Sequence, residues 1–221
     1  MQKLSERLMC IADTVKPCGC MADIGTDHAY VPIYLCMENK VKTAIAGDVS
    51  KGSAEKARQN VEFSGLNERI SVRLGSGITI LKKEDKADCI VIAGMGGMLM
   101  CDILKNGDIT GVLQLVLQPQ KDIPEVRRFV HSIGFKIEDE KMLCEDNKFY
   151  NIISAVRGGE EYTDMEYEFG KILINKKDKT LKAQLEHEIK ISEALLPKVN
   201  EKRKQELEAQ LLRYKEVLGC L

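Results

Sequence analysis

Up to residue 117, short apolar runs recur along the chain, and segments with helical spacing separate them. The apolar runs lie at 20–24, 43–47, 69–74, 88–93 and 113–117. Segments 4–15, 50–64 and 122–133 carry apolar residues three or four positions apart, and Pro124 suits the first turn of the last segment. Near-continuous apolar strands that alternate with helices predict a parallel sheet covered by helices on both faces.

A strand pair and a helical tail follow the five alternating units. Residues 135–143 and 149–156 read as consecutive strands without a helix between them, which predicts an antiparallel hairpin at the end of the sheet. The remaining chain is rich in lysine and glutamate, and its two apolar stripes break near 197–200. We expect these stripes to form two antiparallel helices, and therefore two domains, at 1–159 and 160–221.

Composition narrows the class of protein without naming one. A hydrophobic content of 44% over 221 residues is enough for a sizeable core, so we do not expect disorder. The 33 lysines and arginines nearly balance the 34 aspartates and glutamates, which leaves a net charge of −1. Any polyanion would therefore have to bind a local basic patch.

The eight cysteines do not match a metal or redox motif. Cys18 and Cys20 are separated by one residue, whereas such motifs separate their cysteines by two. Residues 1–15 lack the apolar core of a signal peptide, and no run reaches the roughly 20 apolar residues of a membrane span. We expect reduced thiols, no metal, no membrane association and a cytoplasmic location.

Unusual residues end four of the predicted strands. In an open parallel sheet, ligands bind beyond the carboxyl ends of the strands, so chemistry is expected at these positions. In chain order the four strand ends are Asp23-Ile24-Gly25-Thr26-Asp27-His28, Gly47-Asp48-Val49, Leu74-Gly75-Ser76-Gly77 and Ala93-Gly94-Met95-Gly96-Gly97.

The charge at the first strand end favours one kind of cofactor. Gly25 lets the backbone approach a ligand, and an acid at the second strand end, Asp48, suits a ribose hydroxyl. The dinucleotide fingerprint G-x-G-x-x-G is absent, because Asp27 stands where it requires a second glycine, and a carboxylate there repels a pyrophosphate. S-adenosylmethionine has no phosphate and carries a positive sulfonium and an ammonium group. Asp23 and Asp27 would therefore attract it.

Together the motifs resemble those of class I S-adenosylmethionine-dependent methyltransferases. More narrowly, DIGTDHAYVP, GDVSKGSAEKARQNV, RLGSG, AGMGG and LQPQKD with RRFVHSIGF are similar to the bacterial tRNA (adenine(22)-N1)-methyltransferases of the TrmK type. The resemblance implies an α/β fold, a Rossmann-like seven-stranded sheet with a C-terminal α-helical coiled-coil hairpin. It also implies S-adenosylmethionine as cofactor and tRNA as partner. Two departures are Asp48, where a glutamate is expected, and Ser76, where many class I enzymes place an acid near the adenine.

The resemblance also implies roles for the residues at the strand ends. The methionine end of the cofactor would be lined by Asp23, Gly25, Thr26, Asp27 and His28. Its ribose and adenine would be bound by Asp48, Val49, Ser76 and Gly77. The floor beneath the transferred methyl group would be formed by Ala93, Gly94 and Met95. The candidate catalytic residues are Asp27, His28 and Met95.

The floor also indicates which atom accepts the methyl group. AGMGG has no side chain that could hold an exocyclic amine, unlike the N/D-P-P-Y motif of amino-methylating enzymes, so a ring nitrogen such as adenine N1 is the easier acceptor. Transfer then needs in-line positioning more than a strong base, although Asp27 or His28 could remove the N6 proton. Candidate RNA phosphate contacts are Lys3, Arg7, Arg58, Lys121, Arg127, Arg128 and Lys148.

The sequence alone leaves other interpretations open. DIGTDHAY could be a tight turn whose acids cap a helix, His28 could be structural, and the glycines of AGMGG could serve packing alone. The chain could also be a small-molecule methyltransferase, or a catalytically silent RNA-binding or coiled-coil adaptor. Because the helical tail could bind RNA or join two copies, we expect a monomer or a weak homodimer.

Overall fold

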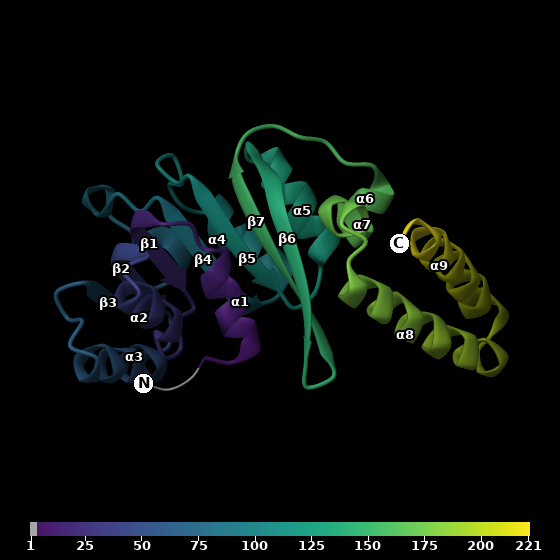
Figure 1. The fold of residues 1–221 in the computed structure, drawn as a ribbon, viewed down its shortest axis with the longest axis horizontal. Helices are drawn as coiled ribbons and strands as arrows, with labels where there is room; N and C mark the ends of the chain where they lie inside the picture. Colours follow the sequence, from purple (N-terminus) through teal and green to yellow (C-terminus); the bar gives the residue numbers. More distant parts are fainter. Residues whose placement is uncertain (1–3) are drawn as a thin grey trace.

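The apolar runs pair side by side in one sheet, as the sequence predicts (Figure 1). The computed structural model describes residues 4–221, and within them the sheet has seven strands in the order β3-β2-β1-β4-β5-β7-β6. The first five strands are parallel, and β7 runs antiparallel to both β5 and β6. The strands are β1 (Cys18–Ile24), β2 (Val41–Asp48), β3 (Ile70–Leu74), β4 (Cys89–Met95), β5 (Gln114–Pro119), β6 (Phe135–Glu145) and β7 (Lys148–Arg157).

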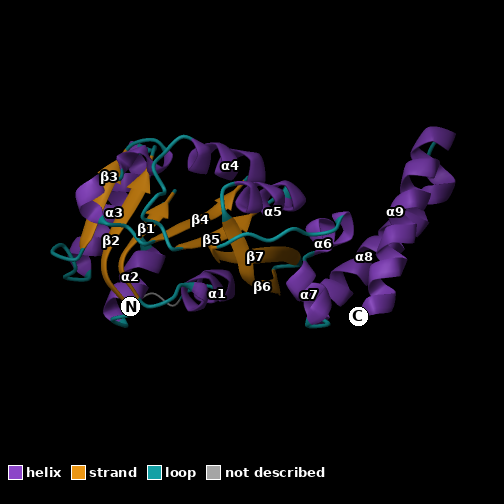
Figure 2. Ribbon diagram, turned by 90° about the horizontal axis from the view of Figure 1, so that it is seen from above, coloured by secondary structure: helices purple, strands orange, loops and turns teal. Residues whose placement is uncertain are grey.

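Helices cover both faces of the sheet, because successive strand residues present apolar side chains to opposite faces. One face packs against α1 (Glu6–Thr14), α2 (Tyr30–Met37) and α3 (Lys51–Phe63). The other face packs against α4 (Gly97–Lys105) and α5 (Ile123–Ser132). Figure 2 shows α1 and α2 on one side of the sheet and α4 and α5 on the other. The predicted α/β sheet with two covered faces is confirmed.

Local signals determine where several helices begin. The Ser5 hydroxyl accepts a hydrogen bond from the Leu8 amide at 3.3 Å and caps α1. The Ser50 hydroxyl accepts from the Ser53 amide at 3.3 Å and caps α3. A proline, Pro124, occupies the first turn of α5. These signals account for the helices that the sequence predicts at the same places.

The C-terminal chain forms the predicted helical hairpin, preceded by two short helices that were not predicted. The hairpin consists of α8 (Lys179–Leu195) and α9 (Glu201–Cys220), and it extends away from the sheet in Figure 1. The unpredicted helices α6 (Asp164–Phe169) and α7 (Lys171–Asn175) contact α5 and β6. Tyr162 and Tyr167 pack into the same core as the sheet. The predicted division at 159/160 stays a prediction, and these contacts join the start of the second segment to the first.

One predicted RNA contact, Arg127, is wrong, because this side chain lies in the interior with only 1% of its surface exposed. Its Nε donates to Glu140 Oε1 at 2.7 Å, and its Nη1 donates to the carbonyls of Tyr167 at 2.7 Å and Glu168 at 3.1 Å. Burial raises the pKa of Glu140, and the Arg127 guanidinium opposes that rise. Arg127 therefore joins α5 to β6 and α6 and has no access to a phosphate.

Replacing Glu140 by glutamine should lower the free energy of unfolding by about 3–5 kcal/mol, because Arg127 would stay buried without its counter-charge. Urea denaturation measures this change. Glu206→Gln is the control, since Glu206 pairs with Arg203 at the surface and its loss should cost less than about 1 kcal/mol. Similar small losses in the two variants would show that the buried pair does not stabilise the fold.

Candidate functional site

The carboxyl ends of β1, β2 and β4 lie side by side at one edge of the sheet. Strand β1 pairs with β2 through Ile24 and Gly47, and with β4 through Ile24 and Ile92. Strands β2 and β3 extend the sheet to one side of β1, and β4 and β5 extend it to the other. Open parallel sheets bind ligands at such a reversal point, because connections leave a crevice there. The structure thus brings the predicted strand-end residues to one edge.

Asp23 is a buried carboxylate at the end of β1, with 7% of its surface exposed. The Thr26 hydroxyl donates a hydrogen bond to its Oδ2 at 2.6 Å. Burial raises the pKa of Asp23 to about 6, the Thr26 hydrogen bond opposes the rise, and Asp48 adds to it. Within residues 4–221, no basic side chain forms an ion pair with Asp23. A buried acid in this state fits a cationic ligand group.

The loop after β1 has a strained backbone. Gly25 has φ +81°, and two residues with side chains, Asp27 and Ala29, also have positive φ, at +33° and +56°. A Cβ atom at Gly25 would collide with the side-chain methyl group of Met95, so the β1 loop and the end of β4 come into close contact there. Strain of this kind persists where the surrounding structure over-determines it, and it concentrates at ligand sites.

Asp27 and His28 interact with each other and with the neighbouring helices. His28 Nε2 lies 3.3 Å from Asp27 Oδ2, and the His28 ring stacks on Tyr30 with 5.0 Å between centroids and 4° between planes. The Ser53 hydroxyl donates to Asp27 Oδ1 at 2.9 Å, and Asn60 Nδ2 donates to the His28 carbonyl at 2.9 Å. Tyr30, Ser53 and Asn60 were not predicted. All three lie in motifs that carry the resemblance, Tyr30 in DIGTDHAY and the other two in GDVSKGSAEKARQNV, but no role was assigned to them.

The end of β2 places Asp48 beside the start of α3. Its Oδ1 accepts a hydrogen bond from the Ser50 amide at 2.7 Å, and its carbonyl accepts from the Gly75 amide at 2.9 Å. Val49 follows with 75% of its surface exposed, although it is apolar. An oriented carboxylate next to an exposed apolar side chain suits a sugar hydroxyl next to a flat ring.

Ile80 covers the ends of β2 and β3. A Cβ atom at Gly47 or at Gly75 would collide with the Ile80 side chain, so both glycines permit this contact. The predicted residues Ser76 and Gly77 lie in the turn between β3 and Ile80, with Ser76 exposed and Gly77 at φ +53°. Ile80 is therefore an apolar side chain at this edge of the sheet that the sequence pattern did not predict.

The end of β4 contains a bulge at Gly94. Ala93 pairs with Gln118 and Met95 pairs with Pro119, so Gly94 is the extra residue, with φ +76°. All three predicted floor residues, Ala93, Gly94 and Met95, are half-buried. The following Gly97 packs against backbone, since its Cβ position lies 2.6 Å from the Lys121 carbonyl oxygen. In AGMGG, Gly97 thus permits close packing against backbone, whereas Gly94 leaves an open surface.

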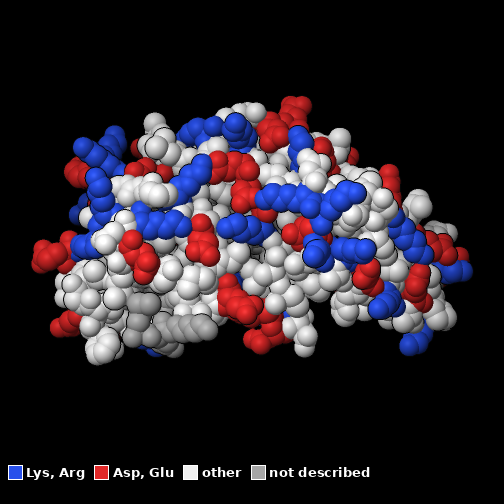
Figure 3. Space-filling model, in the orientation of Figure 1, with Lys and Arg blue, Asp and Glu red and all other residues white. Residues whose placement is uncertain are grey.

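The predicted RNA contacts differ in their exposure and in their acidic partners. Arg58, Lys121 and Lys148 are exposed, and Arg58 lies 3.3 Å from Glu55. Arg128 pairs with Asp164 at 2.7 Å, and Lys3 lies outside the described residues. Figure 3 shows blue side chains in a band across the upper part of the face, interrupted by acidic ones. A polyanion on this face would meet a surface of mixed charge.

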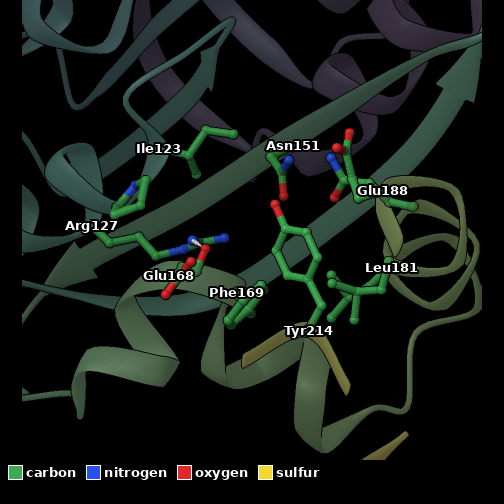
Figure 4. Close-up of a pocket in the computed structure, with 11 residues that line it drawn as sticks. Ile123, Arg127, Asn151, Glu168, Phe169, Leu181, Glu188 and Tyr214 are labelled. Atoms are coloured by element: carbon green, nitrogen blue, oxygen red, sulfur yellow. Dashed lines mark hydrogen bonds between the residues drawn. The ribbon is translucent and has the colours of Figure 1, made fainter. Parts of the chain in front are cut away.

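A separate cavity of about 250 Å³ lies between the sheet and the C-terminal helices (Figure 4). Its walls include residues of α5, β7, α6, α8 and α9, and none of the strand-end residues described above contributes to them. In Figure 4 the side chains of Asn151 and Tyr214 point toward each other across it. This cavity belongs to the junction with the helical hairpin and is distinct from the strand-end crevice.

Residues 4–221 contain neither a candidate metal cluster nor a candidate membrane-spanning helix. Among residues 4–221, no three His, Cys, Asp or Glu side chains cluster in a way that could hold a metal ion. No helix in the same part of the chain is long and apolar enough to cross a membrane.

Comparison with known proteins gives consistent matches. The family model described as TrmK, tRNA (adenine(22)-N(1))-methyltransferase, matches residues 21–217. The tRNA (adenine(22)-N(1))-methyltransferase of Bacillus subtilis (strain 168) is 42% identical over 158 residues, which span 71% of this chain and 66% of that enzyme.

Solved structures cover nearly the whole chain. A Streptococcus pneumoniae protein in complex with S-adenosyl-L-methionine is 34% identical, with a TM-score of 0.91 over 98% of this chain and 100% of the other. TrmK of M. capricolum, in complex with S-adenosyl-homocysteine, is 28% identical, with a TM-score of 0.90 over 99% of both chains.

The sheet order, the acid-lined crevice and these similarities define a class I S-adenosylmethionine-dependent methyltransferase. The chain belongs to the TrmK family of tRNA (adenine(22)-N1)-methyltransferases, because the family model matches most of its length. As a member of this family it is an enzyme that methylates tRNA with S-adenosylmethionine as the donor.

Asp23 should make the free energy of unfolding depend on pH. The pKa of Asp23 is raised from 3.8 to about 6 in the folded protein. Its stabilising contribution to the free energy of unfolding is therefore fully present below about pH 4 and is lost as the pH rises through about 6. Asp23→Asn should therefore stabilise the ligand-free protein at pH 7.5, by on the order of 3 kcal/mol, with no gain near pH 4. Denaturant unfolding at both pH values measures this difference.

Asp27→Asn is the matched control, since Asp27 lies in the same loop with its side chain 62% exposed. This variant should keep the pH dependence of the wild-type protein. If the Asp23→Asn and wild-type stabilities differed by the same amount at pH 4 and pH 7.5, Asp23 would not be the buried titrating acid.

Proposed function

We propose that the crevice at the ends of β1, β2 and β4 binds S-adenosylmethionine and directs its methyl group to N1 of adenine 22 in tRNA. The observation that carries this proposal is Asp23, a buried carboxylate without a basic partner in the described chain. The bound cofactor supplies an electrophilic methyl group on a positive sulfonium. An acid at this place attracts its ammonium group and repels phosphate-bearing cofactors.

The proposed binding roles follow the order of the strand ends. Gly25, Thr26, Asp27 and His28 line the methionine end next to Asp23. Asp48 accepts hydrogen bonds from the ribose, and the exposed side chain of Val49 packs on the adenine, with Ile80 as the opposite apolar wall. Ser76 and Gly77 contact the adenine edge. Ala93, Gly94 and Met95 form the floor on which the acceptor base lies.

Positioning carries most of the proposed catalysis. The floor at Gly94 has no side chain, so it supports the face of a base without binding an exocyclic amine. A ring nitrogen attacks through its lone pair, which requires alignment rather than a strong base. Asp27 and His28 are close enough to share a proton, since His28 Nε2 lies 3.3 Å from Asp27 Oδ2. This pair takes up the N6 proton as positive charge develops on the base.

RNA contacts are proposed on the exposed basic side chains. Arg58, Lys121 and Lys148 bind phosphates, and Arg7 lies at the crevice itself. Arg128 contributes less, because Asp164 already neutralises it and its guanidinium lies over the Tyr167 ring, 4.2 Å from the centroid. Extrusion of the target base is part of the proposal, because the N1 edge of a stacked or paired adenine is inaccessible.

Assembly, location and domain division are also proposed. The catalytic unit spans residues 1–159, and the segment 160–221 forms the helical unit that helps to hold tRNA. The enzyme acts as a monomer or a weak homodimer without a metal ion. The cytoplasm is the proposed location, because its substrate is tRNA and because all eight cysteines are free thiols.

Nucleoside mass spectrometry tests the proposed reaction. Incubation of unmodified tRNA with the protein and S-adenosylmethionine should give 1-methyladenosine at position 22. A tRNA transcript with guanosine at position 22 is the control and should remain unmethylated. N6-methyladenosine or a methylated guanosine in place of 1-methyladenosine would refute the proposed chemistry.

A further inference from the structure

Tyr150 lies beyond the carboxyl edge of the parallel strands. Strand β7 is antiparallel to β5, and their pairing ends at Leu117 opposite Ile153. Tyr150 comes earlier in β7, so it stands past the end of this pairing, where β7 pairs only with β6, through Leu143. Figure 1 shows the β6–β7 hairpin extending past the other strands at the bottom of the view. The Tyr150 ring is half-buried on this extension.

The side chains of Arg7 and Gln118 hold the Tyr150 ring in place. The Arg7 guanidinium lies over the Tyr150 ring, 5.4 Å from its centroid. Arg7 Nη1 in turn donates to Gln118 Oε1 at 2.8 Å. Gln118 is 1% exposed, and its Nε2 donates to the Pro119 carbonyl at 3.1 Å, so both ends of its amide are used. Arg7 therefore has a defined position between the end of β5 and Tyr150.

The same arginine borders the methyl-transfer floor. Arg7 Nη1 lies 3.8 Å from the position that a Cβ atom of Gly94 would occupy, and Gln120 Nε2 lies 4.0 Å from it. Gln118 pairs with Ala93, the residue before the bulge. Tyr150 is therefore joined through a single side chain to the surface on which the acceptor base would lie. In the described chain, no carboxylate forms an ion pair with the Arg7 guanidinium.

We propose that Tyr150 is the surface on which the extruded target adenine stacks, and that Arg7, held by Gln118, is the positioning residue that keeps the ring in place. This inference rests on the proposed function. An adenine taken out of its stack loses its neighbouring bases, and enzymes that extrude a base replace them with aromatic or apolar side chains. Arg7 braces the ring next to the floor, and the ring keeps a partly exposed surface for the base.

The orientation of the base explains why an aromatic ring is needed beside Gly94. Gly94 supports the base without a side chain that could fix the angle of the base. Stacking on Tyr150 supplies that angle, and in-line attack by N1 depends on it. The phenol hydroxyl has no part in this role, so phenylalanine should replace tyrosine at this position.

Two measurements on the full-length enzyme test the inference. Tyr150→Ala should lower kcat/KM for tRNA by roughly 10- to 100-fold, the range expected for the loss of one base–aromatic stack, and should leave the affinity for S-adenosylmethionine unchanged. Tyr150→Phe should retain wild-type activity. In a tRNA transcript with 2-aminopurine at position 22, the fluorescence of the complex should be higher with Tyr150→Ala than with the wild type or Tyr150→Phe.

Phe63→Ala is the matched control, because it removes an aromatic ring that is 91% exposed on α3. It should leave both the kinetics and the fluorescence unchanged. A Tyr150→Ala variant that behaves like Phe63→Ala would overturn the inference, as would equal losses in Tyr150→Ala and Tyr150→Phe. If the wild-type enzyme gives no 1-methyladenosine at position 22, the proposed function fails, and the inference fails with it.

Discussion

The pairing of β1 with β2 on one side and β4 on the other is the arrangement on which the rest of the structure depends. Since β2 and β3 extend the sheet away from β1 in one direction and β4 and β5 in the other, the connecting helices cover opposite faces. One core joins α1, α2 and α3 to the sheet, and a second core joins α4 and α5 to it. The crevice at the end of β1 is what this reversal leaves open.

The crevice combines a buried acid with unusual backbone. Burial is the main reason that the pKa of Asp23 is raised to about 6, against the opposing Thr26 hydrogen bond, and a cationic ligand would stabilise its charged form further. Gly25 and Gly94 both have positive φ, and Met95 lies against Gly25. The loop after β1 and the bulge of β4 thus meet at one edge of the sheet, where we propose that the first binds the donor and the second supports the acceptor.

Much of this site could be predicted because its residues follow apolar strands directly. The pattern DIGTDH after a strand predicts a ligand loop, and AGMGG predicts an open surface. Neither prediction depends on residues far away in the sequence. The burial of Arg127 could not be predicted in the same way. Its position in the sequence of α5 does not show that its hydrogen-bond partners lie on β6 and α6. The role proposed for Tyr150 could not be predicted either. The Arg7 side chain lies over the Tyr150 ring on β7 and donates to Gln118, which is 111 positions from Arg7 in the sequence.

Hydrogen–deuterium exchange with and without S-adenosylmethionine tests the central claim most directly. The claim is that the donor binds in the strand-end crevice and not in the cavity beside the helical hairpin. Slower exchange is expected in residues 23–30, 47–50, 75–78 and 93–97 when the donor is added. Slower exchange confined to residues 123–127 and 181–188, which border the cavity, would contradict it.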